Sequence, residues 1–431
     1  MPSGSPVVDI RNGLYDPIFL TLYAQEEAHF HRQRWMKVID DHEKRIGLSD
    51  VRLFSSPGRT ELSGNHTDHN RGRVLAAGIH LDTIAAVTQS AEDSAQAMIV
   101  ELLSEGYPEV RVNLAELEKV EGERGHTDAI IRGIAASIVR RKGRIGGFRA
   151  TTASRVLKGS GLSSSATLEI LVGSVFNELF NDGRFTPMEL AVMGQEAEND
   201  YFGKPCGLMD QIACSMAGVV SIDFVDPSSP LIEPISTNFA AAGYTLTVVN
   251  PGGDHAELTS DYAAIPEEMK AVAGALGVEA LRDVDEKRFL KSIPSLRAIA
   301  GDRALLRSLH FFGENARVAE MTKSLKAGDI ESYLDGVRRS GDSSFRFLQN
   351  VYSPRHLSDQ ALTLALALTE KFLQGKGACR VHGGGFAGTI QVFVPTERFD
   401  DYVKCMEGYF SKGSIVPLSL RSLPAGELPL V

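Results

Sequence analysis

The chain has 431 residues, of which 43% are hydrophobic and 23% are charged, and its formal net charge is −10. This length exceeds one ordinary core, so two or three domains are expected. The acidic balance argues against nucleic acid and anionic membranes as main partners, although a local site for a small anion can still be electropositive.

Neither a membrane-spanning helix nor a signal peptide is expected. No window approaches about 18 uninterrupted apolar residues, and the first residues lack a basic stretch followed by an apolar run. The four cysteines, Cys206, Cys214, Cys379 and Cys405, form no Cys-x-x-Cys pair. So few cysteines in a long chain do not suggest a disulfide framework. We therefore expect a cytoplasmic protein with reduced thiols.

The first expected element is a helix from Tyr23 to Ile46, where apolar positions recur at helical spacing. A polar, turn-rich stretch follows, which reads Pro57-Gly-Arg-Thr-Glu-Leu-Ser-Gly-Asn-His-Thr-Asp-His-Asn. Its donors and acceptors could line a sugar site. His66, Asp68 and His69 could instead bind a metal, although no further cluster has ligand spacing. A solvated polar turn is the commoner structure for such a composition.

A Gly/Ser loop carries the sharpest local signal. After an expected strand from Val74 to Val87, the chain reaches the run Lys158-Gly-Ser-Gly-Leu-Ser-Ser-Ser-Ala-Thr. A helix follows, because apolar residues fall on one face at Leu168, Leu171, Val172, Val175, Phe176 and Leu179. Such a loop offers backbone N–H groups and the positive end of the helix dipole to a triphosphate. The spacing does not match that of a Walker loop. The alternative to a phosphate-binding loop is an ordinary helix capped by a serine.

Two carboxylates lie in the next segment, which reads Glu198-Asn-Asp-Tyr-Phe-Gly-Lys-Pro-Cys-Gly-Leu-Met-Asp. Glu198 is expected on a helix, and Asp210 where the helix from Gln211 to Met216 begins. One carboxylate could bind a metal and the other a proton or a sugar hydroxyl. The alternatives are a solvated helix face for Glu198 and an N-cap for Asp210.

The clearest linker candidate is Pro227 to Pro230. We therefore expect an N-terminal domain at residues 1–226 and a C-terminal domain at residues 235–431. Mixed strand and helix patterns in both halves predict α+β domains with a cleft between them.

A run of glycines marks the last part of the chain. Ala304 to Phe372 is largely helical in pattern, and two strands are expected at Ala378 to Val381 and Thr389 to Val394. Between them, His382 to Gly388 permits close backbone approach to a ligand, although a hairpin turn would explain the glycines equally well.

These motifs, in this order, resemble the GHMP kinase superfamily and, within it, the galactokinase family. Pro57 to Asn70 resembles the galactokinase signature, roughly G-R-x-N-L-I-G-E-H-T-D-Y-N. Gly161 to Ala166 matches the phosphate motif G-L-S-S-S-A, and His382 to Gly388 resembles the third motif, G-G-G-F-G-G. Ala197 to Gln211 matches A-E-x-x-x-x-G-x-P-C-G-x-M-D-Q, and a weaker match, H-x-x-x-E-x-x-R-V, runs from His310 to Val318.

The resemblance implies a two-domain GHMP kinase fold of the α+β class. The active site would lie in the cleft between an N-terminal mixed-sheet domain and a C-terminal α+β domain. The implied reaction is phosphorylation of the C1 hydroxyl of galactose, with ATP as co-substrate and Mg²⁺ as cofactor. Sugar and ATP are then the small-molecule partners, and protein partners are left open.

The resemblance also implies roles for individual residues. Asp210 would accept or orient the proton of the sugar C1 hydroxyl, and Arg59 would stabilise Asp210 and the charge moving toward the γ-phosphoryl group. Glu198 and Ser165 would bind Mg²⁺. The implied ATP-binding residues are Gly159, Ser160, Gly161, Leu162, Ser163, Ser164, Ser165 and Ala166.

Further residues are implied around the sugar. Asp68 would accept hydrogen bonds from secondary hydroxyls of the sugar, and Asn65 and His66 would contact the C6 end of the sugar. Tyr262 would lie over the sugar. The substrate-binding set is completed by glycines that present backbone to the sugar or shape its pocket: Gly207, Gly384 and Gly385.

The signature is not matched throughout. Its Asn is Glu61 here, its acidic residue before the histidine is Asn65, and its tyrosine is His69. Because Asn65 carries no charge to repel a sugar carboxylate, a kinase for galacturonate or another C6-modified sugar is an alternative. A non-catalytic galactose and ATP sensor is a second one, against which the intact Ser163 to Ala166 run argues.

Overall fold

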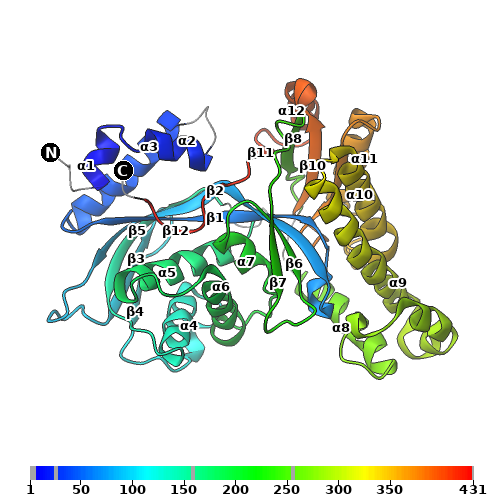
Figure 1. The fold of residues 1–431 in the computed structure, drawn as a ribbon, viewed down its shortest axis with the longest axis horizontal. Helices are drawn as coiled ribbons and strands as arrows, with labels where there is room; N and C mark the ends of the chain where they lie inside the picture. Colours follow the sequence, from blue (N-terminus) through cyan, green and yellow to red (C-terminus); the bar gives the residue numbers. More distant parts are fainter. Residues whose placement is uncertain (1–5, 24–27, 157–160, 254–257, 430–431) are drawn as a thin grey trace.

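The computed structural model describes residues 6–23, 28–156, 161–253 and 258–429. Its strands form two sheets (Figure 1). The larger sheet follows the order β12-β1-β2-β5-β3-β4, with β6 pairing β2 and β7 pairing β6. Its strands are β1 Arg52–Ser63, β2 Arg73–Gln89, β3 Ile99–Ser104, β4 Val110–Asn113, β5 Phe148–Ser154, β6 Val219–Asp223, β7 Leu231–Ile235 and β12 Gly426–Glu427. Because β3 pairs in parallel with β5 while the other pairs are antiparallel, this sheet is mixed.

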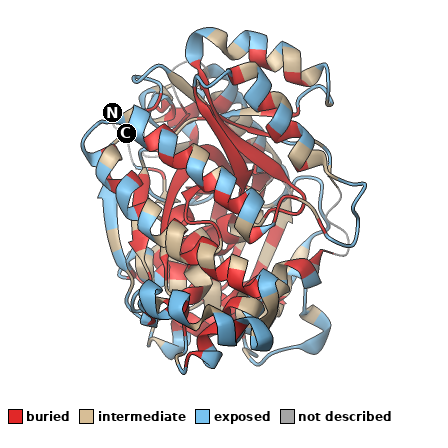
Figure 2. Cartoon of the chain, turned by 90° about the vertical axis from the view of Figure 1, so that its right-hand side faces the viewer, coloured by how far each residue is buried: buried red, intermediate tan, exposed pale blue. Residues whose placement is uncertain are grey.

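The smaller sheet has the order β11-β8-β10-β9 and is antiparallel throughout. Its strands are β8 Tyr244–Val249, β9 Ala378–His382, β10 Thr389–Pro395 and β11 Ile415–Leu418. The β9–β10 hairpin confirms the two strands expected around the glycine run. Both sheets are buried over most of their length (Figure 2).

Helices cover both faces of the larger sheet (Figure 1). On one face lie α1 Pro6–Arg11, α2 Asp16–Tyr23 and α3 Ala28–Arg45. On the other lie α4 Thr127–Arg140, α5 Ser164–Phe180, α6 Pro187–Glu196 and α7 Met209–Ser215. The remaining helices accompany the smaller sheet and are α8 Thr259–Ala275, α9 Glu286–Lys326, α10 Ile330–Ser343, α11 Ala361–Leu373 and α12 Phe399–Glu407. Among the described residues, no helix is both long and apolar enough to cross a membrane.

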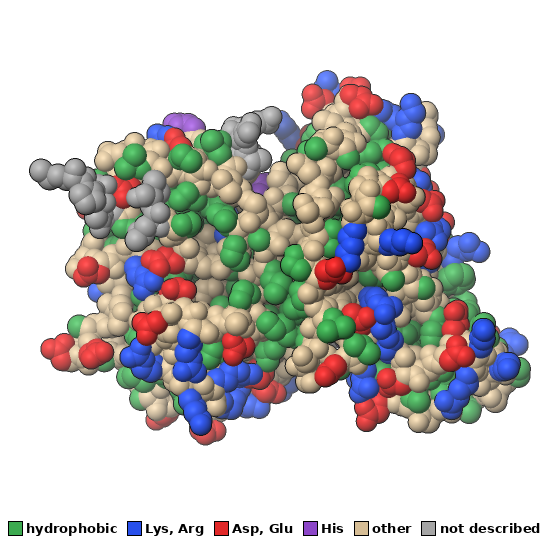
Figure 3. Space-filling model, viewed as in Figure 1, with side chains coloured by type: hydrophobic (Ala, Val, Ile, Leu, Met, Phe, Trp, Pro, Cys, Tyr) green, Lys and Arg blue, Asp and Glu red, His purple; other side chains and the backbone are tan. Residues whose placement is uncertain are grey.

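A shared hydrophobic cluster joins the two sheets. It includes Leu75 and Ile79 of β2, Leu246 and Phe393 of the smaller sheet, and Val318 of α9. Burying apolar surface from both sheets in one cluster fixes their relative position. Apolar side chains gather in the middle of the face seen in Figure 3, and side chains of both charge signs surround them. The arrangement confirms the α+β class.

Two expectations about chain organisation are corrected. Pro227 to Pro230 is no linker between domains, because it is the turn between β6 and β7, which pair in the larger sheet. The chain end also returns to the larger sheet, where β12 pairs with β1. The limits 1–226 and 235–431 therefore do not separate the two sheets, since β7 and β12 are both strands of the larger one.

The stretch from Pro57 to Asn70 is also not a turn throughout. Its first half, to Ser63, is the buried end of β1, and only Gly64 to Asn70 is turn and short helix. The strand is irregular near Gly58, where its register with β2 shifts. A Cβ at Gly58 would lie 2.9 Å from the carbonyl oxygen of Leu162. Gly58 therefore permits close approach of another loop and does not mark a turn.

Candidate active site

The Gly/Ser loop leads into α5, as predicted. Ser163 occupies the N-cap position with a left-handed backbone (φ 64°) and, in the described structure, makes no side-chain cap hydrogen bond. Its hydroxyl donates to Asp210 instead. The N-terminus of α5 therefore keeps backbone N–H groups and the positive end of its dipole for an anion. Gly159 and Ser160, two of the predicted ATP-binding residues, lie outside the described residues.

Arg59 and Asp210 form a bidentate ion pair beside this loop. Arg59 Nε donates to Asp210 Oδ1 at 2.7 Å and Nη2 donates to Oδ2 at 2.8 Å. Arg59 Nη1 also donates to the carbonyl of Gly161. The arginine side chain is 8% exposed and the aspartate 29%, so the carboxylate can still be reached by a ligand. Burial opposes ionisation, but Arg59 and the Ser163 hydroxyl lower the pKa of Asp210 below its ordinary value.

Asp210 lies in the first turn of α7, and Leu208 is the N-cap of that helix. The N-cap alternative for Asp210 is therefore wrong. The carboxylate is held by Arg59 and Ser163, which come from two other elements that meet it in the fold.

Glu198 lies in a π-helical segment, Ala197–Phe202, that continues α6. Its side chain is 3% exposed, so it is not on a solvated helix face. Lys204 Nζ lies 2.9 Å from Glu198 Oε1, and Gln211 Nε2 donates to Oε2 at 3.1 Å. Glu169, a residue that the sequence did not single out, accepts from the same Gln211 nitrogen at 2.8 Å. Burial and the neighbouring Glu198 raise the pKa of Glu169 well above its ordinary value.

Helix α9 holds the end of β1 and the turn that follows it in place. Glu314 Oε1 accepts from the hydroxyl of Ser63 at 3.0 Å and from the backbone N–H of Gly64 at 2.9 Å. His310 Nε2 donates to the carbonyl of Asn65 at 2.9 Å. Burial opposes ionisation of Glu314, but Arg317 and other neighbouring charges lower its pKa to about 2. The weaker match from His310 to Val318 thus has a structural meaning, because these residues fix the turn that begins at Gly64.

The glycine run of the third motif is held through its carbonyl groups. Asn65 Nδ2 donates to the carbonyl of Gly383 at 2.5 Å, and His66 Nε2 donates to that of Gly384 at 3.0 Å. The hydroxyl of Tyr262 donates to Gly385 at 2.9 Å. Burial lowers the pKa of His66 to about 4, so its ring is neutral near pH 7. The predicted sugar residues Asn65, His66 and Tyr262 thus all meet the glycine turn, which lies between β9 and β10.

Asn65 does not offer the sugar contact that was expected of it. Asn65 is fully buried, and its two amide hydrogens point to Glu61 and Gly383. Its Oδ1 accepts from Asn350 Nδ2 at 2.8 Å. Asn350 was not predicted, because no sequence pattern connects a lone asparagine after a helix with a loop far away in the chain.

Asp68 and Gly207, two of the predicted substrate-binding residues, lie against each other. Asp68 is 13% exposed on its side chain, and a Cβ at Gly207 would overlap its Oδ2. Gly207→Ala is therefore expected to displace the Asp68 carboxylate and to lower kcat/KM for the sugar by about 10–100-fold, with the KM for ATP unchanged. Gly274→Ala is the control, since a Cβ there meets nothing within 4 Å. An unchanged sugar KM in Gly207→Ala would remove Asp68 from the sugar site.

The alternative of a metal site at His66, Asp68 and His69 finds no support. Among the described residues, no group of three or more His, Cys, Asp or Glu side chains could hold a metal ion. His66, Asp68 and His69 therefore form no such group.

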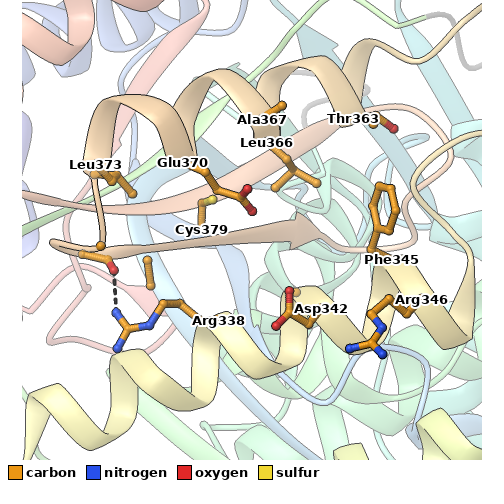
Figure 4. Close-up of a pocket in the computed structure, with 14 residues that line it drawn as sticks. Arg338, Asp342, Phe345, Arg346, Thr363, Leu366, Ala367, Glu370, Leu373 and Cys379 are labelled. Carbon is orange, nitrogen blue, oxygen red and sulfur yellow. Dashed lines mark hydrogen bonds between the residues drawn. The ribbon is translucent and has the colours of Figure 1, made fainter.

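A hollow of about 610 Å³ lies between α10 and α11, with Asp342, Glu370 and Cys379 in its lining (Figure 4). It contains none of the predicted site residues.

Two family models match the chain. The model of the GHMP kinases N terminal domain matches residues 129–218, and that of the galactokinase galactose-binding signature matches residues 40–89. The galactokinase of Actinobacillus pleuropneumoniae is 28% identical over 368 residues, which cover 85% of this chain and 91% of that protein. The galactokinase of Glaesserella parasuis is 26% identical over 371 residues, with 86% and 92% covered.

Solved structures show the same fold. The structure of Lactococcus lactis galactokinase complexed with galactose superposes with a TM-score of 0.76 at 23% identity, and covers 92% of this chain and 99% of that one. A mevalonate kinase structure has a TM-score of 0.59 at 14% identity, with 87% and 99% covered. The motifs, the fold and the relatives agree: the chain carries the GHMP kinases N terminal domain and the galactokinase galactose-binding signature, and it is similar to galactokinases over most of its length.

Proposed function

We propose that the protein transfers the γ-phosphoryl group of ATP to the C1 hydroxyl of galactose, which gives galactose 1-phosphate and ADP. The observation that carries this proposal is the contact of Asp210 with both Arg59 and Ser163. It places an ionised carboxylate, a guanidinium and a helix N-terminus around one point. Phosphoryl transfer needs chiefly such positioning and neutralisation of spread negative charge.

In the proposed reaction, the C1 oxygen bonds to the γ-phosphorus while the bond from that phosphorus to the β–γ bridging oxygen breaks. Asp210 orients the C1 hydroxyl and receives its proton, which then passes to solvent. Arg59 keeps Asp210 ionised and lies near the charge that develops on the transferred group. The N-terminus of α5 and the loop from Gly161 to Ser165 hold the phosphates.

Mg²⁺ fits the donors that are present. Ser165 and Glu198 offer a hydroxyl and a carboxylate, and Mg²⁺ prefers oxygen ligands, usually one or two carboxylates together with substrate phosphates and water. One oxygen of the nearby Glu169 has no hydrogen-bond partner among the described residues. When bound, the ion would neutralise phosphate charge, and we propose that Glu198 and Ser165 hold it.

Glu198→Gln is expected to raise the Mg²⁺ concentration needed for half-maximal activity. The amide keeps the shape of the side chain but loses the charge that a cation between Glu198 and the phosphates would balance. A Mg²⁺ titration of activity at saturating ATP and sugar measures the shift. Glu118→Gln, an exposed glutamate, should titrate like the wild type. If Glu198→Gln does so as well, Glu198 is no metal ligand.

Galactose is the favoured sugar, because the relatives of this chain are named galactokinases. The buried Asn65 gives no direct contact that would select a C6-modified sugar. The intact Ser163 to Ala166 run and Asp210 argue against a non-catalytic sensor. The free cysteines and the use of ATP support a cytoplasmic location.

A panel of galactose, galacturonate and arabinose tests the choice of sugar. We expect kcat/KM for galactose to exceed that for galacturonate by about tenfold or more, since a site for a hydroxyl does not satisfy a buried carboxylate. A preference for galacturonate would contradict galactose as the substrate and leave the kinase class intact.

A further inference from the structure

Glu61 and Asn65 form a buried acid–amide pair. Glu61 is 3% exposed and Asn65 is fully buried, and Asn65 Nδ2 donates to Glu61 Oε1 at 3.0 Å. The second hydrogen of this amide is directed at the carbonyl of Gly383, 2.5 Å away. A primary amide has two donors, so Asn65 keeps none for a ligand.

Glu61 also supplies the counter-charge of Arg380. Arg380 is fully buried on β9, and its Nη2 lies 2.5 Å from Glu61 Oε1. Side chains alternate along a strand, so Cys379 faces the hollow between α10 and α11 (Figure 4), while Arg380 turns toward Glu61 of β1. Nε and Nη1 of Arg380 have no hydrogen-bond partner among the described residues. Loss of the Glu61 charge would therefore leave a buried guanidinium uncompensated.

The pair has room for only one carboxylate. A carboxylate at position 65 would face Glu61 at hydrogen-bond distance and the carbonyl oxygen of Gly383. All three groups are acceptors, so both contacts would become repulsive at this buried position. The uncharged amide at position 65 is thus matched to the acid at position 61.

We propose that Asn65 is a positioning residue, whose amide ties the Glu61–Arg380 ion pair to the glycine turn of the third motif. Through Gly383 it fixes the turn whose next carbonyls are held by His66 and Tyr262. The sugar pocket then depends on Asn65 without any contact between Asn65 and the C6 substituent. This inference deepens the proposed function and rests on it for its kinetic test.

The kinetic test compares Asn65→Ala with the wild type on galactose and on 6-deoxygalactose, which lacks the C6 hydroxyl. We expect kcat/KM to fall by about tenfold or more, by the same factor on both sugars, with the KM for ATP unchanged. Asn12→Ala, an exposed asparagine, should behave like the wild type. If the loss is confined to galactose, Asn65 contacts the C6 hydroxyl and the proposal is overturned.

A stability test needs no activity. Asn65→Asp places a second carboxylate against Glu61 and is expected to lower Tm. Adding Glu61→Gln removes the repulsion and leaves one carboxylate in the pair, so the double variant should melt about 2 °C or more above Asn65→Asp alone. A double variant that melts at or below Asn65→Asp overturns the pairing. If the wild type did not phosphorylate galactose, the proposed function would fail while this comparison kept its meaning.

Discussion

Asp210→Asn is expected to lower turnover by about 10²–10⁴-fold, the usual contribution of a positioned general base. Asparagine preserves the shape of the side chain but carries no charge to attract the C1 proton. Arg59 and Ser163 would still surround it, because both can donate to the amide oxygen. The N-terminus of α5 is untouched by the change, so ATP affinity should remain close to that of the wild type.

Steady-state kinetics and calorimetric titration with a non-hydrolysable ATP analogue measure the two properties separately. Asp200→Asn is the matched control, since Asp200 is exposed and lies in the same stretch of chain. The melting temperature of Asp210→Asn must also be recorded, because the substitution unpairs Arg59. A loss of turnover of less than about threefold would be far smaller than the usual contribution of a general base. Such a result would exclude Asp210 as the catalytic carboxylate.

Asp82→Asn is expected to destabilise the fold by about 3–5 kcal/mol, the usual cost of breaking a buried ion pair. Asp82 is fully buried in β2, and Arg34 Nη1 lies 2.5 Å from its Oδ1. Its Oδ2 accepts from the hydroxyl of Tyr23 at 2.7 Å and from Arg421 at 3.4 Å. The carboxylate therefore joins the N-terminal helices, the larger sheet and the C-terminal segment.

This contribution should depend on pH. Burial alone would raise the pKa of Asp82, but Arg34 and Arg421 lower it below its ordinary value. For a carboxylate with a lowered folded pKa, the stabilisation is present above the unfolded pKa of about 3.9 and is lost as pH falls through the folded pKa. The difference in Tm between wild type and Asp82→Asn should thus shrink below about pH 4.

Asp93→Asn provides the comparison, because Asp93 is exposed in the segment after β2. Thermal or urea unfolding of all three proteins is measured from about pH 8 down to about pH 2.5, so that the range includes the pH values at which the difference should shrink. Equal stabilities of wild type and Asp82→Asn at pH 7 would contradict this prediction. They would show that the free energy of desolvating the buried carboxylate cancels the stabilisation by its partners.

The Gly/Ser loop before α5 and two strands of the smaller sheet, β9 and β10, could be predicted, because their signals are local. Glycines and serines before a helical apolar pattern identify the start of α5, and β-branched residues around the glycine run identify β9 and β10. The same local method failed near Gly58. A Pro-Gly pair usually marks a turn, whereas here it lies in a strand that another loop approaches closely.

The contacts that hold the site together could not be predicted from local patterns. Arg380 lies 319 residues from its partner Glu61, and a single buried arginine has no periodic signature. Glu169 falls on an otherwise apolar helix face and resembles any helical glutamate until Gln211 and Glu198 are placed beside it. The resemblance to a family suggested the candidate catalytic and binding residues, and the fold was needed to identify the residues that contact them.

Identification of the reaction product tests the central claim most directly. The purified protein is incubated with ATP, Mg²⁺ and galactose, and the products are followed by ¹H and ³¹P NMR. We predict one ADP for each sugar phosphate, and coupling of the new phosphorus to the anomeric proton. Asp210→Asn at the same concentration should form almost none of this product. A phosphate on another carbon, or ATP hydrolysis without a phosphorylated sugar, would contradict the account.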